Sequence, residues 1–303
     1  MASDSAVLLM AYGTPERLED VEAYFTHIRG GRTPAPESVA NLRERYERVG
    51  GATPLLKISE DARAGLEAEL AATGRAQPVY MGMKHWHPYV AETVQKMYDD
   101  GIRHVTALVL APHYSRMSIG GYRKAMDEKM AALGDPFELR FVDHWYEQPS
   151  FVTFMAGLVQ RALTQFPEAD CAGVTVVFTA HSLPERIRTW NDPYEAQLQE
   201  SAELVARAAG LPAFRRAWQS AGGTGEPWIG PDILDYLDTL KAEGVRNVLQ
   251  VPIGFVSDHL EVLFDIDIEA KDKARELGMV LHRTELPNAK PEFIKVLADV
   301  VGP

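Results

Sequence analysis

Short runs of apolar and β-branched residues recur along the chain, separated by polar and amphipathic segments. These runs are polar on neither face, which is typical of strands covered on both sides in a parallel sheet. We therefore predict strands at 6–10, 78–81, 105–111, 139–142, 174–180, 248–253 and 279–281.

Several of the intervening segments have the apolar period of a helix. In the segment 55–70, apolar side chains at Leu55, Ile58, Ala62, Leu66 and Leu70 fall on one helical face. The same period predicts helices at 90–98, 233–240 and 291–300. Strands that alternate with helices predict a doubly wound α/β architecture, in which ligands bind outside the carboxyl ends of the strands.

The chain also contains a weak internal repeat. The segment 9–16 is similar to 178–185, and 100–105 is similar to 243–248. The alternative is a chance match between two α/β patterns. A true repeat predicts two similar halves, 1–145 and 146–303, with a cleft between them. Tyr12 and His181 would then occupy matching positions, each just past the first strand of its half.

The charge balance and the cysteine count restrict the class of protein. The formal net charge is −12, which opposes binding to nucleic acid or to an anionic membrane. No window approaches the ~18 apolar residues of a membrane span. The apolar segment 6–10 also lacks the cationic start of a secretory signal. The single cysteine, Cys171, excludes a disulfide framework and a cluster held by several thiolates of this chain. We expect a soluble, cytoplasmic protein with no nucleic-acid partner and no membrane insertion.

A histidine ends one of the predicted buried strands. His181 follows the run 174–180, and Pro184 prevents the strand from continuing much further. Functional side chains concentrate in loops at strand ends. The alternative is a buried histidine whose ring is satisfied by backbone hydrogen bonds.

The segment 258–269 combines carboxylates with apolar residues. Glu261, Asp265 and Glu269 are spaced four apart and would form one line on a helix. The residues between them are mostly apolar, so the helix should be largely buried, where carboxylates are costly unless they bind a cation or a proton. The alternative is a solvated acidic face. Oxygen ligands beside an imidazole suit a divalent first-row metal such as Fe²⁺.

The segment 29–48 is rich in arginine, a side chain that grips carboxylates in bidentate fashion. Its arginines are Arg29, Arg32, Arg43, Arg45 and Arg48. This pattern indicates an anion-binding surface. The alternative is ion pairing with the local glutamates, which are Glu37, Glu44 and Glu47.

Other motifs are weaker. His85 and His87 have the spacing of a metal pair on a strand face, but Pro88 interferes with that geometry. The glycine-rich segment 220–228 fits neither nucleotide fingerprint and favours a flexible wall against a flat ligand, with Trp228 as a stacking face. Ser182 lacks the Gly-x-Ser-x-Gly surroundings of a hydrolase nucleophile.

Taken together, the strings at 10–15, 24–29, 179–187 and 254–261 resemble the ferrochelatase family over nearly the whole chain. The opening Ala-Tyr-Gly-Thr-Pro is most similar to the coproporphyrin III ferrochelatases, which are class II chelatases. The resemblance implies two Rossmann-like domains, each a parallel sheet flanked by helices. It also implies insertion of Fe²⁺ into coproporphyrin III, which gives coproheme in haem biosynthesis.

The same resemblance implies roles for individual residues. His181 and Glu261 would be the catalytic residues and the iron site, and Tyr12 would be the axial contact to iron in the product. The residues implied at the rim that binds the propionates are Arg29, Arg45, Tyr46, Thr53 and Tyr122.

Further positions follow from the resemblance with less detail. Asp265 and Glu269 would extend the metal route from solvent, whereas Lys84 and His85 match a family position near the cleft whose role is open. Gly30 stands where the family often has a second arginine, which puts in doubt how tightly one propionate is held.

The implied reaction has defined partners. Fe²⁺ is a substrate metal, no cofactor or iron–sulfur cluster is permanently bound, and coproheme passes in a transient handover to a downstream decarboxylase. A neutral imidazole is expected to serve as ligand and base near pH 7. The alternatives are a protoporphyrin IX ferrochelatase, a chelatase that inserts Co²⁺ or Ni²⁺ into a more reduced tetrapyrrole, and a non-catalytic porphyrin or haem carrier.

Overall fold

The computed structural model describes residues 4–168, 173–223 and 225–302 and contains two parallel four-stranded sheets. The first has the order β2-β1-β3-β4, formed by Val79–Met83, Ser5–Ala11, His104–Val109 and Glu138–Val142. The second has the order β6-β5-β7-β8, formed by Arg215–Gln219, Val174–His181, Asn247–Val251 and Val280–Arg283. The two orders are equivalent, which confirms the internal repeat. The predicted α/β class is also confirmed.

Contacts between residues divide the chain into two units. The first unit contains Met1–Trp145, Ser257–Leu260 and Asn288–Pro303, and the second contains Tyr146–Val256 and Glu261–Pro287. The predicted division also fell between residues 145 and 146, but it assigned the whole C-terminal segment to the second half. The segment joins the first unit because α11 (Pro291–Val301) packs on α3 (Leu55–Ala72). Whether each unit folds as an independent domain stays a prediction, as does the cleft between the halves.

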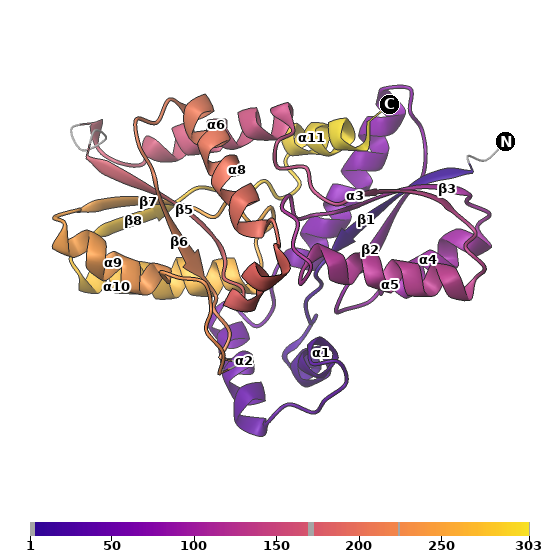
Figure 1. Cartoon of the computed structure of the whole chain (residues 1–303), viewed down its shortest axis with the longest axis horizontal. Coiled ribbons are helices and arrows are strands. Elements are labelled where there is room, and N and C mark those ends of the chain that lie inside the picture. The colour runs from indigo at the N-terminus through magenta and orange to yellow at the C-terminus, as the bar shows by residue number, and fades with distance from the viewer. Residues whose placement is uncertain (1–3, 169–172, 224, 303) are drawn as a thin grey trace. The chain divides into compact units, whose positions relative to one another are not determined.

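In the first unit, helices cover both faces of the sheet (Figure 1). On one face, α4 (Val90–Asp99) and α5 (Ile119–Ala132) pack on β1 and β3 through a core that includes Leu8, Met97 and Met126. On the other face lie α3 and α11. A short 3₁₀ helix, η1 (Leu18–Asp20), and the helices α1 (Val21–Ile28) and α2 (Pro36–Arg48) lie between β1 and α3 in the sequence.

The second unit has the same layers. On one face, α9 (Ile233–Ala242) and α10 (Lys271–Glu276) bury Leu237 and Ala274 against the sheet. On the other face lie α6 (Pro149–Leu163) and α8 (Tyr194–Ala209) (Figure 1). A 3₁₀ helix, η2 (Glu185–Trp190), follows β5, and a π-helix, η3 (Val262–Ala270), precedes α10.

Every predicted strand and helix is present, with shifts of a few residues at the ends. Strand β6 was missed because its sequence, Arg-Arg-Ala-Trp-Gln, is not an apolar run. It is an edge strand whose first residues are not buried, so burial did not select apolar residues there. The helical period after Glu261 was predicted, whereas its π form was not.

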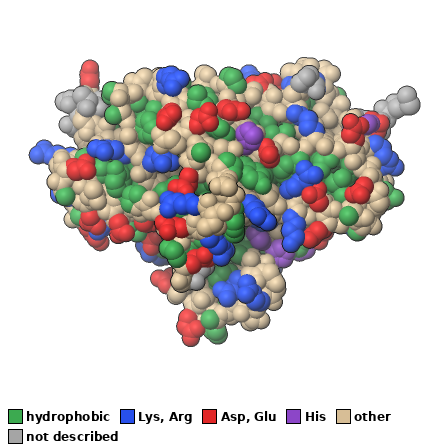
Figure 2. All heavy atoms as spheres, viewed as in Figure 1, with side chains coloured by type: hydrophobic (Ala, Val, Ile, Leu, Met, Phe, Trp, Pro, Cys, Tyr) green, Lys and Arg blue, Asp and Glu red, His purple; other side chains and the backbone are tan. Residues whose placement is uncertain are grey.

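The molecular surface carries side chains of both charges, and the helices that the structure describes include no apolar span of membrane length. Lys and Arg side chains are interspersed with Asp and Glu side chains over the face seen in Figure 2. Within the described ranges, no helix has both the length and the apolar character needed to cross a membrane.

Candidate functional site

His181 is the last residue of β5, which is the strand in the second unit equivalent to β1 in the first. Its ring Nδ1 donates a hydrogen bond to the carbonyl oxygen of Ser182. This bond fixes the ring so that Nε2 faces the Oε1 atom of Glu261 at 3.4 Å. Each of the two side chains is 29% exposed, so the pair remains accessible to a ligand. Two residues remote in sequence therefore meet as predicted.

The surroundings of His181 set its protonation state. Burial lowers the pKa of the imidazole, but the Glu261 carboxylate, the hydrogen bond to the Ser182 carbonyl and the Asp265 carboxylate together raise it by more, to about 9. The imidazole is therefore protonated at pH 7 in the metal-free protein. This differs from the neutral ring that the sequence led us to expect, because the sequence did not show a carboxylate within ion-pair distance.

Glu261 immediately precedes the π-helix η3, and the predicted line of carboxylates continues along it. Asp265 is only 5% exposed and accepts a hydrogen bond from the hydroxyl of Ser220. A solvated acidic face is therefore wrong for this position. π-helical turns close i→i+5 hydrogen bonds and often lie at functional sites. The described residues contain no group of three His, Cys, Asp or Glu side chains arranged to hold a metal.

Two aromatic side chains support the strand end at His181. The Tyr194 hydroxyl donates to the His181 carbonyl oxygen at 3.1 Å, and the Trp228 ring lies 6.2 Å from the His181 ring. A Cβ atom at Gly222 would lie 2.6 Å from the Trp228 ring, so the glycine makes room for that ring. Trp228 was predicted as part of a wall, whereas no local motif marks Tyr194.

In the first unit, the ends of β1 and β2 place Tyr12 beside His85. The backbone N–H of Lys84 donates to Ala11 and that of His85 donates to Tyr12, both at 2.9 Å. This pairing carries the ladder beyond the strands and brings the Tyr12 and His85 rings to 4.7 Å. Tyr12 is 41% exposed, so its ring is accessible to a ligand.

Tyr122 lies in α5 close to this strand end. Its side chain is buried, and burial together with the nearby Tyr12 raises the pKa of its phenol well above the ordinary value. The hydroxyl therefore stays protonated and can donate a hydrogen bond. The Nζ atom of Lys84 lies 5.1 Å from the centre of the Tyr122 ring.

Two more predicted rim residues meet through a residue that the prediction did not include. The hydroxyls of Thr14 and Tyr46 are 2.9 Å apart, and the Thr53 hydroxyl donates to that of Thr14 at 3.1 Å. Tyr46 is only 1% exposed, so its ring belongs to the core of this unit. Thr14 could have been identified as a site residue from the sequence, because it belongs to the Ala-Tyr-Gly-Thr-Pro motif.

The two arginines of the predicted rim lie at the carboxyl ends of α1 and α2. Arg29 caps the carboxyl end of α1, is exposed, and places its guanidinium 5.8 Å above the Phe25 ring. Arg45 lies in the last turn of α2. The alternative of local ion pairs is wrong, because Glu37, Glu44 and Glu47 form none with any residue that the structure describes.

The two histidines after β2 contact different partners. The Nδ1 atom of His85 lies 3.1 Å from Nδ1 of His27, whereas Nδ1 of His87 lies 3.1 Å from the Glu92 carboxylate. Burial, together with Lys84 and His27, lowers the pKa of His85 to about 3, so its ring is neutral. His85 and His87 therefore do not form the metal pair that their spacing suggested.

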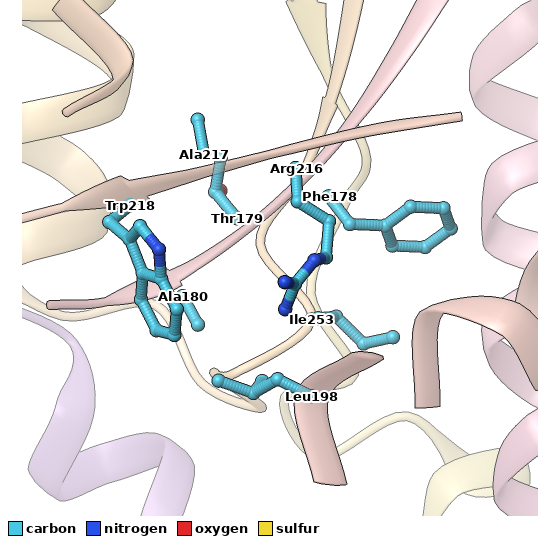
Figure 3. Close-up of a pocket in the computed structure, with 8 residues that line it drawn as sticks. All are labelled: Phe178, Thr179, Ala180, Leu198, Arg216, Ala217, Trp218 and Ile253. Atoms are coloured by element: carbon cyan, nitrogen blue, oxygen red, sulfur yellow. The ribbon is translucent and has the colours of Figure 1, made fainter. Parts of the chain in front are cut away.

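The second unit contains a small, mainly apolar cavity of about 10 Å³, and Figure 3 shows the residues that line it. Its lining residues are Phe178, Thr179, Ala180, Leu198, Arg216, Ala217, Trp218 and Ile253. None of the predicted site residues lines it. The volume lies below the range of ~300–1,000 Å³ that is common for small-molecule sites. We therefore place no substrate in this cavity.

The two equivalent parallel sheets, each flanked by helices, have the fold of solved chelatases. The sirohydrochlorin chelatase SirB of Bacillus subtilis subspecies spizizenii, solved with cobalt, superposes with a TM-score of 0.57 at 11% identity. That comparison covers 99% of this chain and 94% of the other. SirB of Bacillus subtilis, solved with Fe³⁺, gives 0.59 at 10% identity over 100% of this chain and 96% of the other. These likenesses show the fold alone.

Sequence comparison defines the family. The Ferrochelatase family model matches residues 4–303. A ferrochelatase of Herpetosiphon aurantiacus is 50% identical over 99% of both chains. The coproporphyrin III ferrochelatase of Bacillus subtilis is 43% identical, over 97% of this chain and 96% of the relative. That of Listeria monocytogenes is 41% identical, over 99% and 98%. The chain belongs to the ferrochelatase family.

Proposed function

We propose that this chain inserts Fe²⁺ into coproporphyrin III and releases coproheme. The observation that carries the proposal is the pair formed by the Nε2 atom of His181 and the Oε1 atom of Glu261, at 3.4 Å. Several relatives of 41–44% identity are named coproporphyrin III ferrochelatases, and the 50% identical relative is named a ferrochelatase. Those names support the choice of a tetracarboxylate porphyrin as substrate.

The reaction requires a metal site and a place for two protons. A free-base porphyrin loses its two pyrrole protons when Fe²⁺ enters, and the products are the metalloporphyrin and two protons. In the metal-free protein, His181 carries a proton that Glu261 stabilises. Arrival of Fe²⁺ displaces that proton to solvent, and the neutral Nε2 atom then becomes a ligand beside the carboxylate.

Proton acceptance follows metal transfer. As Fe²⁺ passes to the pyrrole nitrogens, Nε2 of His181 is vacated and can take up one pyrrole proton. The Glu261 carboxylate and the buried Asp265 supply negative charge that favours the imidazolium again. The pair thereby returns to its initial protonation state, and the second proton leaves to solvent. Asp265 and Glu269 are proposed to guide the metal toward the pair along η3.

The residues of the first unit are proposed to hold the macrocycle. Charged and hydroxyl side chains can bind propionates with charge-assisted hydrogen bonds, and those proposed are Arg29, Arg45, Tyr46, Thr53 and Tyr122. Tyr12, exposed at the end of β1, is proposed as the axial contact to iron in the product. Binding energy from the propionates can be used to bend the ring and expose the nitrogen lone pairs.

Fe²⁺ is a substrate in this proposal, and no resident cofactor or iron–sulfur cluster takes part. The chain has one cysteine, Cys171, which lies outside the described residues, and such clusters need several thiolates. The cytoplasmic location and the handover of coproheme to a downstream decarboxylase stay predictions.

The test is a comparison of initial rates under anaerobic Fe²⁺ with coproporphyrin III and with protoporphyrin IX. We expect faster insertion into coproporphyrin III. A preference for protoporphyrin IX would contradict the proposed substrate, and a preference for Co²⁺ with a more reduced tetrapyrrole would contradict the proposed reaction. Binding of coproheme without any rate above the protein-free control would identify a carrier.

A further inference from the structure

Lys84 is a partly buried cation that the proposed mechanism does not use. It follows β2, and its Nζ atom donates to the backbone carbonyl oxygens of Ser118 at 3.3 Å and Met117 at 3.5 Å. These partners are neutral and the distances are long. Among the described residues, no carboxylate forms an ion pair with this ammonium. A partly buried ammonium without a counter-charge is unfavourable unless a ligand supplies one.

The helix beside Lys84 adds positive charge to the same place. Ser118 is the residue before α5, so the ammonium lies at the amino-terminal end of a 14-residue helix. That end carries partial positive charge from the helix dipole, and the first turn of α5 contains no acidic residue. A cation placed there is destabilised by the helix itself. Both features are relieved by one anion.

Local packing holds the ammonium in this position. A Cβ atom at Gly121 would lie 2.6 Å from Nζ of Lys84 and 2.8 Å from its Cε atom. Glycine is less favourable than alanine inside a helix, so its presence here is explained by the room that Lys84 needs. The next residue, Tyr122, places its ring 5.1 Å from Nζ. The ammonium therefore lies over the face of the buried Tyr122 ring.

We propose that Lys84 binds a carboxylate of the tetrapyrrole substrate, together with the hydroxyl of Tyr122. The ligand class is a propionate side chain, which supplies the missing negative charge beside the ammonium and the positive end of α5. Burial lowers the pKa of Lys84 to about 8, in keeping with an ammonium that lacks its counter-ion in the substrate-free protein. This inference rests on the proposed function, since it assumes a carboxylate-bearing porphyrin.

The test is Lys84→Met, which keeps most of the apolar stem and removes the charge. We expect the KM for coproporphyrin III to rise about 10- to 100-fold with little change in kcat, the range typical of a lost hydrogen bond to a charged group. Lys124→Met is the matched control, because Lys124 is an exposed lysine of α5 that pairs with Glu128. It should leave KM unchanged.

A second pair of variants tests the packing argument without removing the charge. Gly121→Ala should raise KM by pushing the ammonium away, whereas Gly120→Ala meets only ordinary contacts of 3.7 Å or more and should have no effect. Porphyrin fluorescence titration of the two variants without iron measures porphyrin affinity directly and gives the same comparison without turnover.

The same titration with protoporphyrin IX, which has two propionates where coproporphyrin III has four, shows which kind of propionate Lys84 binds. A loss of affinity for both porphyrins by Lys84→Met assigns Lys84 to a shared propionate. A loss for coproporphyrin III alone assigns it to an additional one. Unchanged affinity for both porphyrins would overturn the inference. A wild-type protein that binds porphyrin but inserts no iron would instead contradict the proposed function and leave this binding test intact.

Discussion

The two sheets have the same strand order, yet the residue at the end of the first strand differs. In the first unit this position holds Tyr12, and in the second it holds His181. Tyr12 lies among groups that donate hydrogen bonds or carry positive charge, including Lys84 and Tyr122. His181 lies among carboxylates, with Glu261 at 3.4 Å and Asp265 close enough to raise its pKa.

This difference teaches that one scaffold can supply two opposite environments at equivalent positions. Carboxylates around an imidazole suit a divalent cation, whereas cations and hydroxyls suit the carboxylates of a substrate. The fold therefore determines where the side chains lie, and the local charge determines what each strand end binds. On this account the second unit binds the metal and the first unit binds the macrocycle.

The largest expected effect comes from removing the imidazole at the end of β5. His181→Ala should lower kcat for iron insertion by about 100- to 10,000-fold, because the variant loses both a ligand and a proton acceptor. Porphyrin binding, measured by fluorescence titration, should persist. His104→Ala is a suitable control, since His104 is an exposed histidine at the start of β3. A near-normal rate of iron insertion for His181→Ala would contradict the assignment of the metal to the His181 end of β5.

The next effect concerns the carboxylate that makes the second strand end acidic. Glu261→Gln should lower activity by about 10- to 100-fold, because the amide removes the negative charge that would attract Fe²⁺, and one lost contact to a charged group is typically worth this much. It should also lower the pKa of His181, because burial, which lowers this pKa, remains while the main opposing charge is lost. Histidine NMR titration checks the second point.

The sign of the pH dependence follows from the raised value. A group whose pKa is higher in the folded state stabilises the fold below its unfolded pKa of ~6.5, and this contribution is lost as the pH rises through about 9. Fe²⁺ binding has the opposite trend, because the metal must displace the proton, so affinity should increase toward pH 9. If the pKa of His181 were the same in the wild type and in Glu261→Gln, the Glu261 carboxylate would not be the cause of the raised pKa.

A smaller effect is expected at the substrate-binding side. Arg29→Ala should raise KM for coproporphyrin III about 10-fold with kcat little changed, as expected for one charge-assisted contact. Arg17→Ala is the control, because Arg17 is exposed and pairs with Asp20. A fall in kcat with an unchanged KM would place Arg29 in the chemical step rather than in binding.

The smallest effect concerns the wall beside His181. Gly222→Ala should displace the Trp228 ring, because the new Cβ atom would lie 2.6 Å from it, and KM should rise by about two- to five-fold. Gly223→Ala meets nothing within 4 Å and serves as the matched control. Equal kinetics for the two variants would show that Trp228 does not form part of the binding wall.

Much of the fold could be predicted because its strands are buried on both faces, and burial selects continuous apolar runs such as 174–180. The position of His181 at a strand end followed from the same reasoning. Strand β6 could not be predicted, because its first two residues, Arg215 and Arg216, are not buried and leave no apolar run to recognise. The packing of α11 on α3 is a contact between distant segments that no local pattern encodes.

The sequence predicted that His181 and Glu261 lie together, but it did not predict the protonation state of the pair. The spacing of Glu261 and Asp265 indicated a functional helix, but its π form depends on tertiary packing. The raised pKa of His181 depends on a carboxylate 3.4 Å away that comes from another element. Tyr194 was missed for the same reason, because its hydroxyl reaches the His181 carbonyl only in the folded chain.

The central claim is that His181 and Glu261 bind the incoming iron together. The most direct test is a structure of the protein loaded with Fe²⁺ under anaerobic conditions, with the metal located by its anomalous scattering. The account predicts iron bound to Nε2 of His181 and to a carboxylate oxygen of Glu261. Iron bound elsewhere, with the His181–Glu261 ion pair still intact, would contradict it.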